Sequence, residues 1–258
     1  MNISGAAAKL FWGWQALLRG KLSRYYNDSL YPPLFIEREV LKRTVYLDHF
    51  PHQLFSVRIH LADHQNDPHL HDWFVTPAAC LHVYPSLQDQ EVGQYAALVY
   101  ANCGRVENLK WRLPYRLPSF HMLELVLIDK PEVIAERRNE LEKVARSILV
   151  GQGLKVSPVT ATDAFFLGDR SGAQAFQKLK QLKKEFVFEH DGGEVALASI
   201  NHHEDFFTSR FGIRSGKEIA HSLCLAFGIE RLTTASLAVW GDRKEGWPAE
   251  FRKYASFS

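Results

Sequence analysis

Short stretches in which hydrophobic and polar residues alternate dominate the middle of this chain, and longer stretches with helical spacing flank them. The alternation predicts strands at residues 54–61, 96–102, 122–129, 185–189 and 195–201. Helical spacing predicts helices at residues 37–46, 132–150, 172–184 and 230–239, the last after an apolar run at 221–227 and a turn at Gly228. Hairpin signals outnumber signals for parallel β–α–β units, so we expect an α+β fold with a mainly antiparallel sheet flanked by helices.

The segment 132–150 carries the clearest helix signal. Asp129 is placed to cap it, Pro131 suits its first turn, and Gly151 ends it. One face collects the apolar residues of the segment, which are Ile134, Leu141, Val144, Ala145 and Ile148. A helix with one apolar face packs that face against the body of the protein, and we expect it to lie on the sheet.

The N-terminal segment 1–20 contains an apolar stretch at residues 10–14. Lys9 interrupts it and no small-residue cleavage site follows, which argues against a signal peptide. Nothing in the sequence approaches the ~18 apolar residues of a transmembrane helix. We expect an amphipathic helix docked on the body or on a partner subunit, and a helix lying on a membrane surface is the alternative.

Composition narrows the class of protein only slightly. The 258 residues are 46% hydrophobic and 23% charged, as in an ordinary globular protein, and the net charge of +2 gives no reason to expect a nucleic-acid binder. Three cysteines cannot form a closed disulfide framework. They fit a reducing, cytoplasmic setting better than a secreted one.

Three separated side chains, Cys80, Glu124 and Cys224, are the candidate metal ligands. Two thiolates and a carboxylate suit Zn²⁺, and a tetrahedral ion with three protein ligands keeps its fourth position open to a substrate. The alternative is two buried cysteines that act as small hydrophobes and a locally paired carboxylate. A second polar cluster contains Pro68, lacks helical spacing and is expected to be a solvated loop rather than a metal site; its members are His60, Asp63, Asp67, His69, His71 and Asp72.

Several runs of sequence, in a fixed order, point to a family. Residues 31–33 with 50–52 are similar to motif 1 of class II aminoacyl-tRNA synthetases, and residues 104–107 are similar to motif 2. Residues 76–85 are similar to a stretch that carries a metal ligand, and residues 162–166 match a signature that precedes the carrier-binding helix. Residues 199–205 match the end of the catalytic domain, and residues 228–231 look like the arginine motif that ends it. Together they resemble the amino acid:[carrier protein] ligases, stand-alone relatives of the catalytic domain of atypical, methanogen-type seryl-tRNA synthetases. The resemblance covers almost the whole chain and implies one class II catalytic domain spanning residues 1–258.

The resemblance implies an antiparallel sheet that binds ATP, with Mg²⁺, in a bent form. Arg105 would contact the α-phosphate, where charge develops during attack, and Arg231 would hold the γ-phosphate. Phe120 would stack on adenine with Glu107 near the same ring, and Asn201 is assigned to the nucleotide site as well. A lone arginine in a surface ion pair is the alternative for each guanidinium.

The resemblance also implies that Cys80, Glu124 and Cys224 hold a Zn²⁺ ion that coordinates the amino group of an amino acid. Zinc binds the neutral amine, and such a site selects amino acids over plain carboxylates. Asp163 would approach this substrate, although capping the turn before Phe165 is an equal alternative. Small residues of the glycine or alanine type are the implied substrates.

The basic segment 172–184 has two interpretations. It carries Lys178, Lys180, Lys183 and Lys184, which would form a solvated face or would steer an acidic carrier protein that bears a phosphopantetheine arm. The family relationship implies the second. It also implies a homodimer through the motif 1 region.

Three positions depart from the family pattern. Gly104 replaces an aromatic residue at the start of motif 2, and His121 and Leu123 stand where arginines are expected. Loss of basic groups near a triphosphate would weaken adenylation. The sequence therefore predicts an intact metal site and an eroded nucleotide site.

Three functions follow from these observations. The first is a ligase that forms an aminoacyl-adenylate and transfers the acyl group to the thiol of a carrier protein. The second is a non-catalytic paralogue that keeps the fold and zinc and serves as a binding or regulatory subunit. The third, tRNA aminoacylation, is least favoured because no added tRNA-reading domain is visible and the charge is near neutral.

Overall fold

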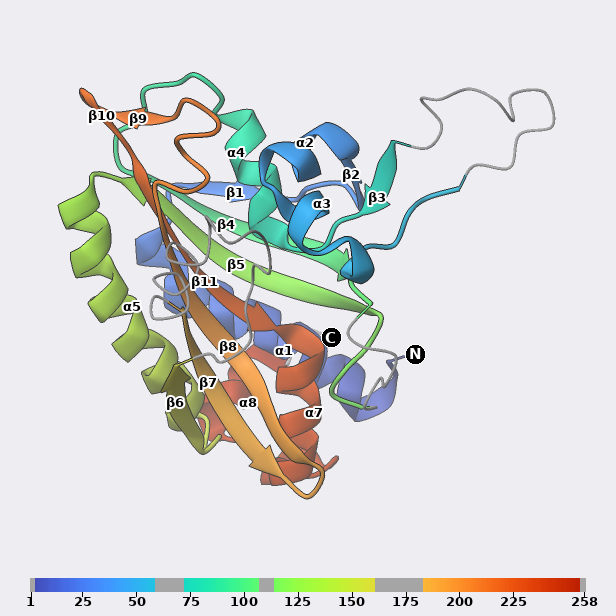
Figure 1. Cartoon of the computed structure of the whole chain (residues 1–258). Helices are drawn as coiled ribbons and strands as arrows, with labels where there is room; N and C mark the ends of the chain where they lie inside the picture. The colour runs from blue at the N-terminus through green and yellow to red at the C-terminus, as the bar shows by residue number, and fades with distance from the viewer. Residues whose placement is uncertain (1–2, 59–71, 107–113, 161–182, 256–258) are drawn as a thin grey trace.

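A computed structural model describes residues 3–58, 72–106, 114–160 and 183–255. Its centre is a seven-stranded sheet in the order β1-β4-β5-β11-β8-β7-β6, in which β1 and β4 are parallel and all other neighbours are antiparallel (Figure 1). The strands of this sheet are β1 Asp28–Leu30, β4 Tyr95–Gly104, β5 Ser119–Asp129, β6 Val156–Thr160, β7 Lys183–His190, β8 Gly193–Glu204 and β11 His221–Gly228. The expected antiparallel sheet is therefore confirmed.

Two small ribbons complete the strands, and helices cover the sheet. The ribbons are β2 Phe35–Glu37 with β3 Trp73–Val75, and β9 Arg214–Ser215 with β10 Glu218–Ile219. The α-helices are α1 Gly5–Leu22, α2 Arg38–Arg43, α3 Tyr46–His49, α4 Val83–Ser86, α5 Pro131–Gly151, α7 Ile229–Trp240 and α8 Ala249–Tyr254. Short 3₁₀ turns lie at Ser23–Tyr25, Pro51–Gln53, Ala79–His82 and Lys244–Gly246.

The pleat of the central strands divides the core into two layers. Leu123, Leu125 and Leu127 of β5 belong to the layer that includes α1, α5, α7 and α8. Val126 and Ile128 face the other way, into the layer formed with α2, α3 and α4. Since successive side chains of a strand point to opposite faces, each central strand contributes to both layers.

The N-terminal helix is docked on the body, as expected. α1 packs on α7 and α8, and Trp14 is completely buried there, with its indole N–H donating to Ser236 Oγ at 2.8 Å. This contact covers the apolar face of α1, which excludes that face from a membrane surface. None of the described helices combines the length and the apolar composition needed to cross a bilayer.

Several local predictions are wrong. Residues 37–46 form two short helices instead of one, because the chain breaks at Val45, which has φ 52°. Residues 54–58 make only an isolated bridge, Ser56 with Phe74, instead of a strand. Lys130 takes the N-cap position of α5, and the Asp129 carboxylate bonds Ser215 instead of capping the helix.

The predicted helix at 172–184 is also wrong at its end. Lys183 and Lys184 begin strand β7, and residues 172–182 lie outside the described part of the chain. The strands predicted at 96–102, 122–129, 185–189 and 195–201 and the helices at 132–150 and 230–239 are confirmed within a few residues. The His and Asp cluster of 60–72 falls outside the described residues except for Asp72, which pairs with Arg38.

Replacing Leu123 by alanine tests the helix-side core. Leu123 is fully buried, so Leu123→Ala should lower the free energy of unfolding by about 2–5 kcal/mol through lost burial and a residual cavity. Chemical denaturation measures this change. Val159→Ala on β6 removes methyl groups from a side chain that is 38% exposed and serves as the control; an equal loss in both variants would contradict the layer assignment.

Candidate active site

Three structural elements bring Cys80, Glu124 and Cys224 to one point. Cys80 lies in the 3₁₀ turn Ala79–His82, Glu124 on β5 and Cys224 on β11. Glu124 and Cys224 are diagonal neighbours on one face, because Cys224 is opposite Val126 in the register of β11 with β5. Their ligand atoms all lie within 4.8 Å of one another, and all three residues are buried. The predicted convergence of these residues is confirmed.

Hydrogen bonds hold the cluster in place. The backbone N–H of Cys80 donates to Glu124 Oε2 at 3.0 Å, which ties the turn to the sheet. Asn201 Nδ2 donates to Cys224 Sγ at 3.3 Å, and His203 Nε2 lies 3.8 Å from the same sulfur. The Nδ1 atom of His203 lies 3.3 Å from the hydroxyls of Tyr84 and Ser222. Such outer contacts orient metal ligands.

The protonation of the cluster suits a cation. The hydrogen bond between the sulfurs leaves the proton on Cys80, and this bond and burial raise the pKa of that thiol well above its ordinary value. The same bond holds the pKa of Cys224 well below its ordinary value, although burial opposes this. Burial raises the pKa of Glu124 to about 8. Acidic groups crowded in a dry site retain protons, and a divalent ion among these donors would supply the charge that allows all three to ionise.

A cavity connects this cluster with the candidate nucleotide residues. Its lining includes all three cluster residues together with Arg105, Phe120 and Arg231. The Arg105 guanidinium carbon lies 5.0 Å from the centre of the Phe120 ring, and Arg231 donates to the carbonyl groups of Tyr115 and Ala196 at 3.1 Å each. These six predicted residues therefore share one space, with cationic groups and a metal-ligand set in its walls.

The departures from the family pattern remove no group from this cavity. Phe120, Met122 and Glu124 line it, whereas the intervening residue Leu123 packs in the helix-side core. His121 is absent from the lining as well, and its ring pairs with Glu230 of α7, which is itself a lining residue. Strand alternation turns both positions to the other face of β5, so neither side chain lines the cavity. The weakened adenylation stays a prediction.

Gly104 has a packing role. A Cβ added there would lie 2.8 Å from Val75 Cγ1 and 3.3 Å from the Pro118 carbonyl oxygen. A side chain at this position would displace β3 or the segment before β5. The glycine therefore allows close packing of these segments, and it is absent from the cavity lining.

The lysines divide between two settings. Lys183 lines the cavity, with Nζ 2.6 Å from Glu185 Oε1, and its side chain is only 16% exposed. Lys184 points to the other side of β7 and pairs with Glu142 of α5 at 2.7 Å. Neither lies on a helical face, so the carrier-binding helix does not include them. Glu107, Asp163, Lys178 and Lys180 lie outside the described residues.

Sequence patterns miss several residues of this site. His203 and Tyr84 lie in runs that resemble the family, 199–205 and 76–85, but no spacing links them to Cys224. The resemblance assigns Asn201 to the nucleotide, and the structure places its amide against the Cys224 sulfur. The sequence assigns Lys183 to a surface helix, and only the register of β7, which puts it opposite Asn201, shows that it faces the cavity.

Comparisons with known proteins agree with this geometry. No family model matches the sequence. Amino acid–[acyl-carrier-protein] ligase 1 of Bradyrhizobium diazoefficiens is 30% identical over 248 residues, covering 88% of this chain and 76% of the relative. Amino acid–[acyl-carrier-protein] ligase 2 of the same organism is 29% identical over 246 residues, covering 86% of this chain and 72% of the relative.

Solved structures show the fold. The M. kandleri SerRS in complex with A. aeolicus tRNASec has a TM-score of 0.80 at 19% identity, covering 97% of this chain and 55% of that one. Seryl-tRNA synthetase from Pyrococcus horikoshii, complexed with ATP, has a TM-score of 0.74 at 14% identity, covering 99% of this chain and 57% of the synthetase chain. The chain thus has the fold of a class II synthetase catalytic domain and spans a little over half the length of these synthetases.

Removal of individual sulfurs tests the metal cluster. Cys80→Ala and Cys224→Ser should each lose most bound zinc, because two protein ligands hold Zn²⁺ far more weakly than three. Elemental analysis of the folded, dialysed proteins measures the zinc content. Cys103→Ala removes the third buried cysteine, which is outside the cluster, and should retain the zinc of the parent. Full zinc in both cluster variants would end the metal assignment.

Proposed function

This chain belongs to the amino acid–[acyl-carrier-protein] ligase family, and from that premise we propose that it adenylates a small amino acid and transfers it to a carrier protein. One observation carries the proposal: the buried Cys–Glu–Cys cluster opens into the same cavity as Arg105 and Arg231. An amine-binding site and a phosphate-binding site in one space are what adenylation of an amino acid requires. The acyl acceptor is the phosphopantetheine thiol of an acidic acyl carrier protein.

The amino acid binds at the cluster. A Zn²⁺ ion held by Cys80, Glu124 and Cys224 would offer its fourth position to the neutral amine of the substrate. Asn201 and His203 keep Cys224 oriented, and both line the cavity beside it. Glycine or alanine is the substrate type that family membership favours, with Asp163 near it.

The nucleotide binds at the other end of the cavity. Phe120 stacks on adenine under the guanidinium of Arg105, and Arg231 holds the γ-phosphate of bent, Mg²⁺-bound ATP. A carboxylate oxygen of the amino acid attacks the α-phosphorus, the bond to the bridging oxygen breaks, and pyrophosphate leaves. Arg105 stabilises the charge that builds on the α-phosphate in the transition state. Lys183 adds a polar group to the cavity wall, and Glu107 is proposed to contact the adenine ring.

The second half-reaction uses the same bound adenylate. The carrier's thiolate forms a bond to the acyl carbon, the bond from that carbon to the phosphate oxygen breaks, and AMP leaves. The thioester therefore forms without a covalent intermediate between the amino acid and the enzyme. Positioning of the two reactants supplies much of the acceleration. Lys178 and Lys180 are proposed to steer the acidic carrier protein toward this site. The cytoplasmic location of the protein stays a prediction.

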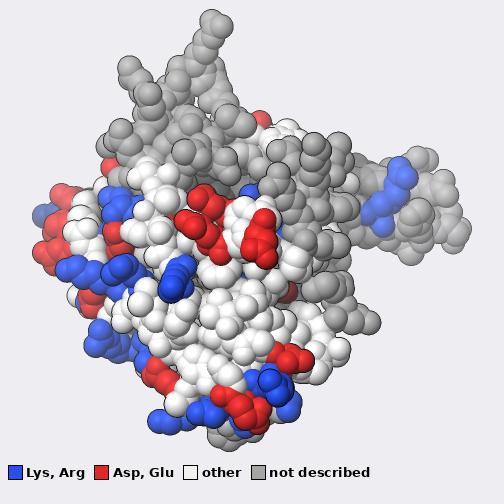
Figure 2. All heavy atoms as spheres, turned by 90° about the horizontal axis from the view of Figure 1, so that it is seen from below, with Lys and Arg blue, Asp and Glu red and all other residues white. Residues whose placement is uncertain are grey.

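The two alternatives have less support. The paralogue hypothesis rests on Gly104 and Leu123, and neither removes a group from the cavity. For tRNA aminoacylation the charge pattern gives little support: Figure 2 shows acidic and basic side chains interspersed on the face that it presents. This distribution matches the net charge of +2 rather than a phosphate-binding surface.

Pyrophosphate exchange tests the proposed function. The parent should form labelled ATP from labelled pyrophosphate in the presence of one small amino acid. Arg105→Ala and Arg231→Ala should each lower the exchange rate by about 10²-fold or more, since each removes preorganised charge from the phosphates. Arg116→Ala, a matched arginine outside the cavity lining, should exchange at nearly the parent rate. Absence of pyrophosphate exchange by the zinc-loaded parent with every amino acid would favour the hypothesis of a non-catalytic paralogue.

A homodimer is part of the proposal. Four large hydrophobic side chains around the motif 1 region and the β2–β3 ribbon are exposed: Tyr31 74%, Leu34 42%, Phe35 41% and Trp73 37%. Phe35 and Trp73 share one face of the ribbon, because Phe35 is opposite Val75 and Glu37 is opposite Trp73. Contiguous exposed apolar groups of this kind mark protein interfaces.

Charges placed in this surface test the dimer. The double variant Leu34→Asp/Phe35→Asp should shift the molar mass in solution from twice the chain mass to the chain mass, because a subunit interface would have to bury two carboxylates. Light scattering measures the mass. Val150→Asp on α5, a 47% exposed position, is the control. A parent that is monomeric at all concentrations would remove the dimer proposal.

A further inference from the structure

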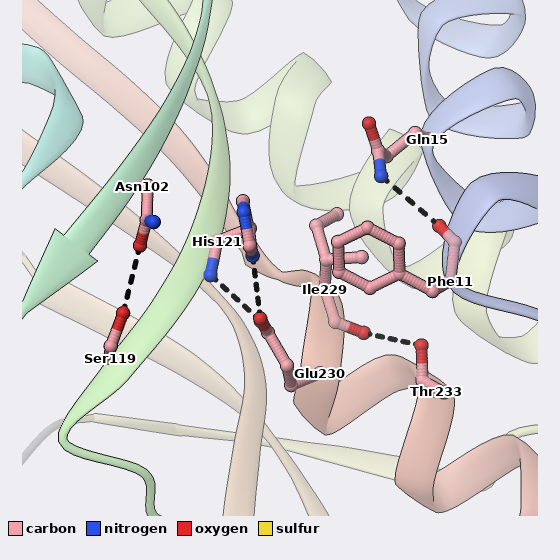
Figure 3. A network of polar contacts seen from close by, with 8 residues as sticks. All are labelled: Phe11, Gln15, Asn102, Ser119, His121, Ile229, Glu230 and Thr233. Carbon is pink, nitrogen blue, oxygen red and sulfur yellow. Dashed lines mark hydrogen bonds and ion pairs between the residues drawn. The ribbon is translucent and has the colours of Figure 1, made fainter. Parts of the chain in front are cut away.

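A polar contact at the wall of the cavity links strand β5 to helix α7. Both oxygens of the Glu230 carboxylate bind His121: Oε2 accepts from the backbone N–H at 2.8 Å, and Oε1 lies 2.7 Å from Nδ1 of the imidazole (Figure 3). A carboxylate acceptor at this distance assigns the ring proton to Nδ1. Glu230 is 6% exposed and lies in the first turn of α7, where a negative charge is favourable.

The residues adjoining this contact are the proposed nucleotide ligands. Phe120 precedes His121 in β5 and lines the cavity, and Arg231 follows Glu230 in α7 and lines the same cavity. His121 and Glu230 form the contact, and their chain neighbours Phe120 and Arg231 line the cavity; Glu230 also lies in the cavity wall, whereas His121 does not. The contact sets the position of the arginine relative to the aromatic ring that would stack on adenine.

Aromatic rings hold the imidazole in its orientation. The Tyr100 ring stacks on His121 with centroids 5.6 Å apart and planes 16° apart, and Phe11 of α1 meets it edge-on at 5.1 Å. Figure 3 shows the Glu230 carboxylate directed at the imidazole from the start of α7, and Phe11 reaching from α1 toward the same helix start. A ring that is packed on two sides presents Nδ1 in one direction, so the carboxylate has a single preferred place.

We propose that His121 and Glu230 are positioning residues for ATP: their contact holds Arg231 where it meets the triphosphate while Phe120 meets the base. This inference rests on the proposed function for the identity of the nucleotide. It assigns a role to a position that departs from the family pattern. His121 contributes its N–H to the carboxylate next to the arginine, and no contact of its own with phosphate is needed.

Two substitutions separate the hydrogen bond from the stacking. His121→Phe keeps a ring between Tyr100 and Phe11 but removes the side-chain donor. His121→Asn keeps an N–H donor close to the position of Nδ1 but removes the ring. We expect His121→Phe to bind ATP about five- to thirtyfold more weakly than the parent, and His121→Asn to recover most of that affinity. The opposite ranking would show that His121 acts only through packing.

A double-mutant cycle tests the route through Arg231. Adding His121→Phe to Arg231→Ala should weaken ATP binding little further, because the positioned group is already absent. An undiminished second loss would overturn the proposal. Ser119→Ala is the matched control: it removes the 3.0 Å bond to Asn102 on the same pair of strands without touching α7, and it should bind ATP as the parent does.

Calorimetry measures the ATP affinity of all these zinc-loaded proteins, with zinc content and unfolding midpoint as checks on folding. Pyrophosphate exchange is measured in parallel. A parent that binds ATP but exchanges no pyrophosphate would refute the proposed function, while the order of affinities would still decide the inference. Normal exchange with unchanged affinity in His121→Phe would refute the inference alone, and a parent that binds no ATP would refute both.

Discussion

The arrangement depends on three buried acidic side chains held together in the wall of the cavity. Cys80, Glu124 and Cys224 are each at most 4% exposed, and burial together with the contact between the sulfurs keeps protons on two of them. Uncompensated charge at such a point costs free energy, so the groups must either stay partly protonated or share a cation. The sheet register and the Cys80 N–H bond to Glu124 impose this crowding before any ion binds. The cluster is thus a candidate cation site whose three donors the fold already brings together.

The pleat of β5 lets one strand perform two tasks. Its residues 120, 122 and 124 line the cavity, whereas residues 123, 125 and 127 pack beneath the helices and His121 binds Glu230. A substitution on the first set changes what the cavity contacts. A substitution on the second set acts through the placement of α7 or through stability. Position in the alternation, rather than distance along the chain from the metal ligands, decides which effect a residue has.

The sequence alone predicts the sheet, the long helices and the members of the cluster, because alternation, capping residues and ordered motifs are local signals. The motif comparison alone does not show which face of its strand each residue takes. The motif pattern places Leu123 where the family has an arginine, and the helical spacing assigns Lys183 to a surface helix. The pleat of β5 puts Leu123 in the helix-side core, and the pairing of β7 with β8 brings Lys183 to the cavity. The break at Val45 escapes prediction since a left-handed β-branched residue has no sequence signal. His203 escapes it because its contacts with Tyr84 and Cys224 join distant segments.

The geometry of β5 also relates the two ends of the cavity. Phe120 and Glu124 lie four residues apart on the same strand face, a separation of about 13 Å at ~3.3 Å per residue. The strand thereby sets the distance between the Phe120 ring and the Cys–Glu–Cys cluster, with the uncharged side chain of Met122 lining the cavity between them. In the proposed function, the phosphate of the bound ligand lies between these ends, near the Arg105 guanidinium that lies over Phe120. An aminoacyl-adenylate has its groups in this order, whereas ATP alone or an amino acid alone occupies one end only.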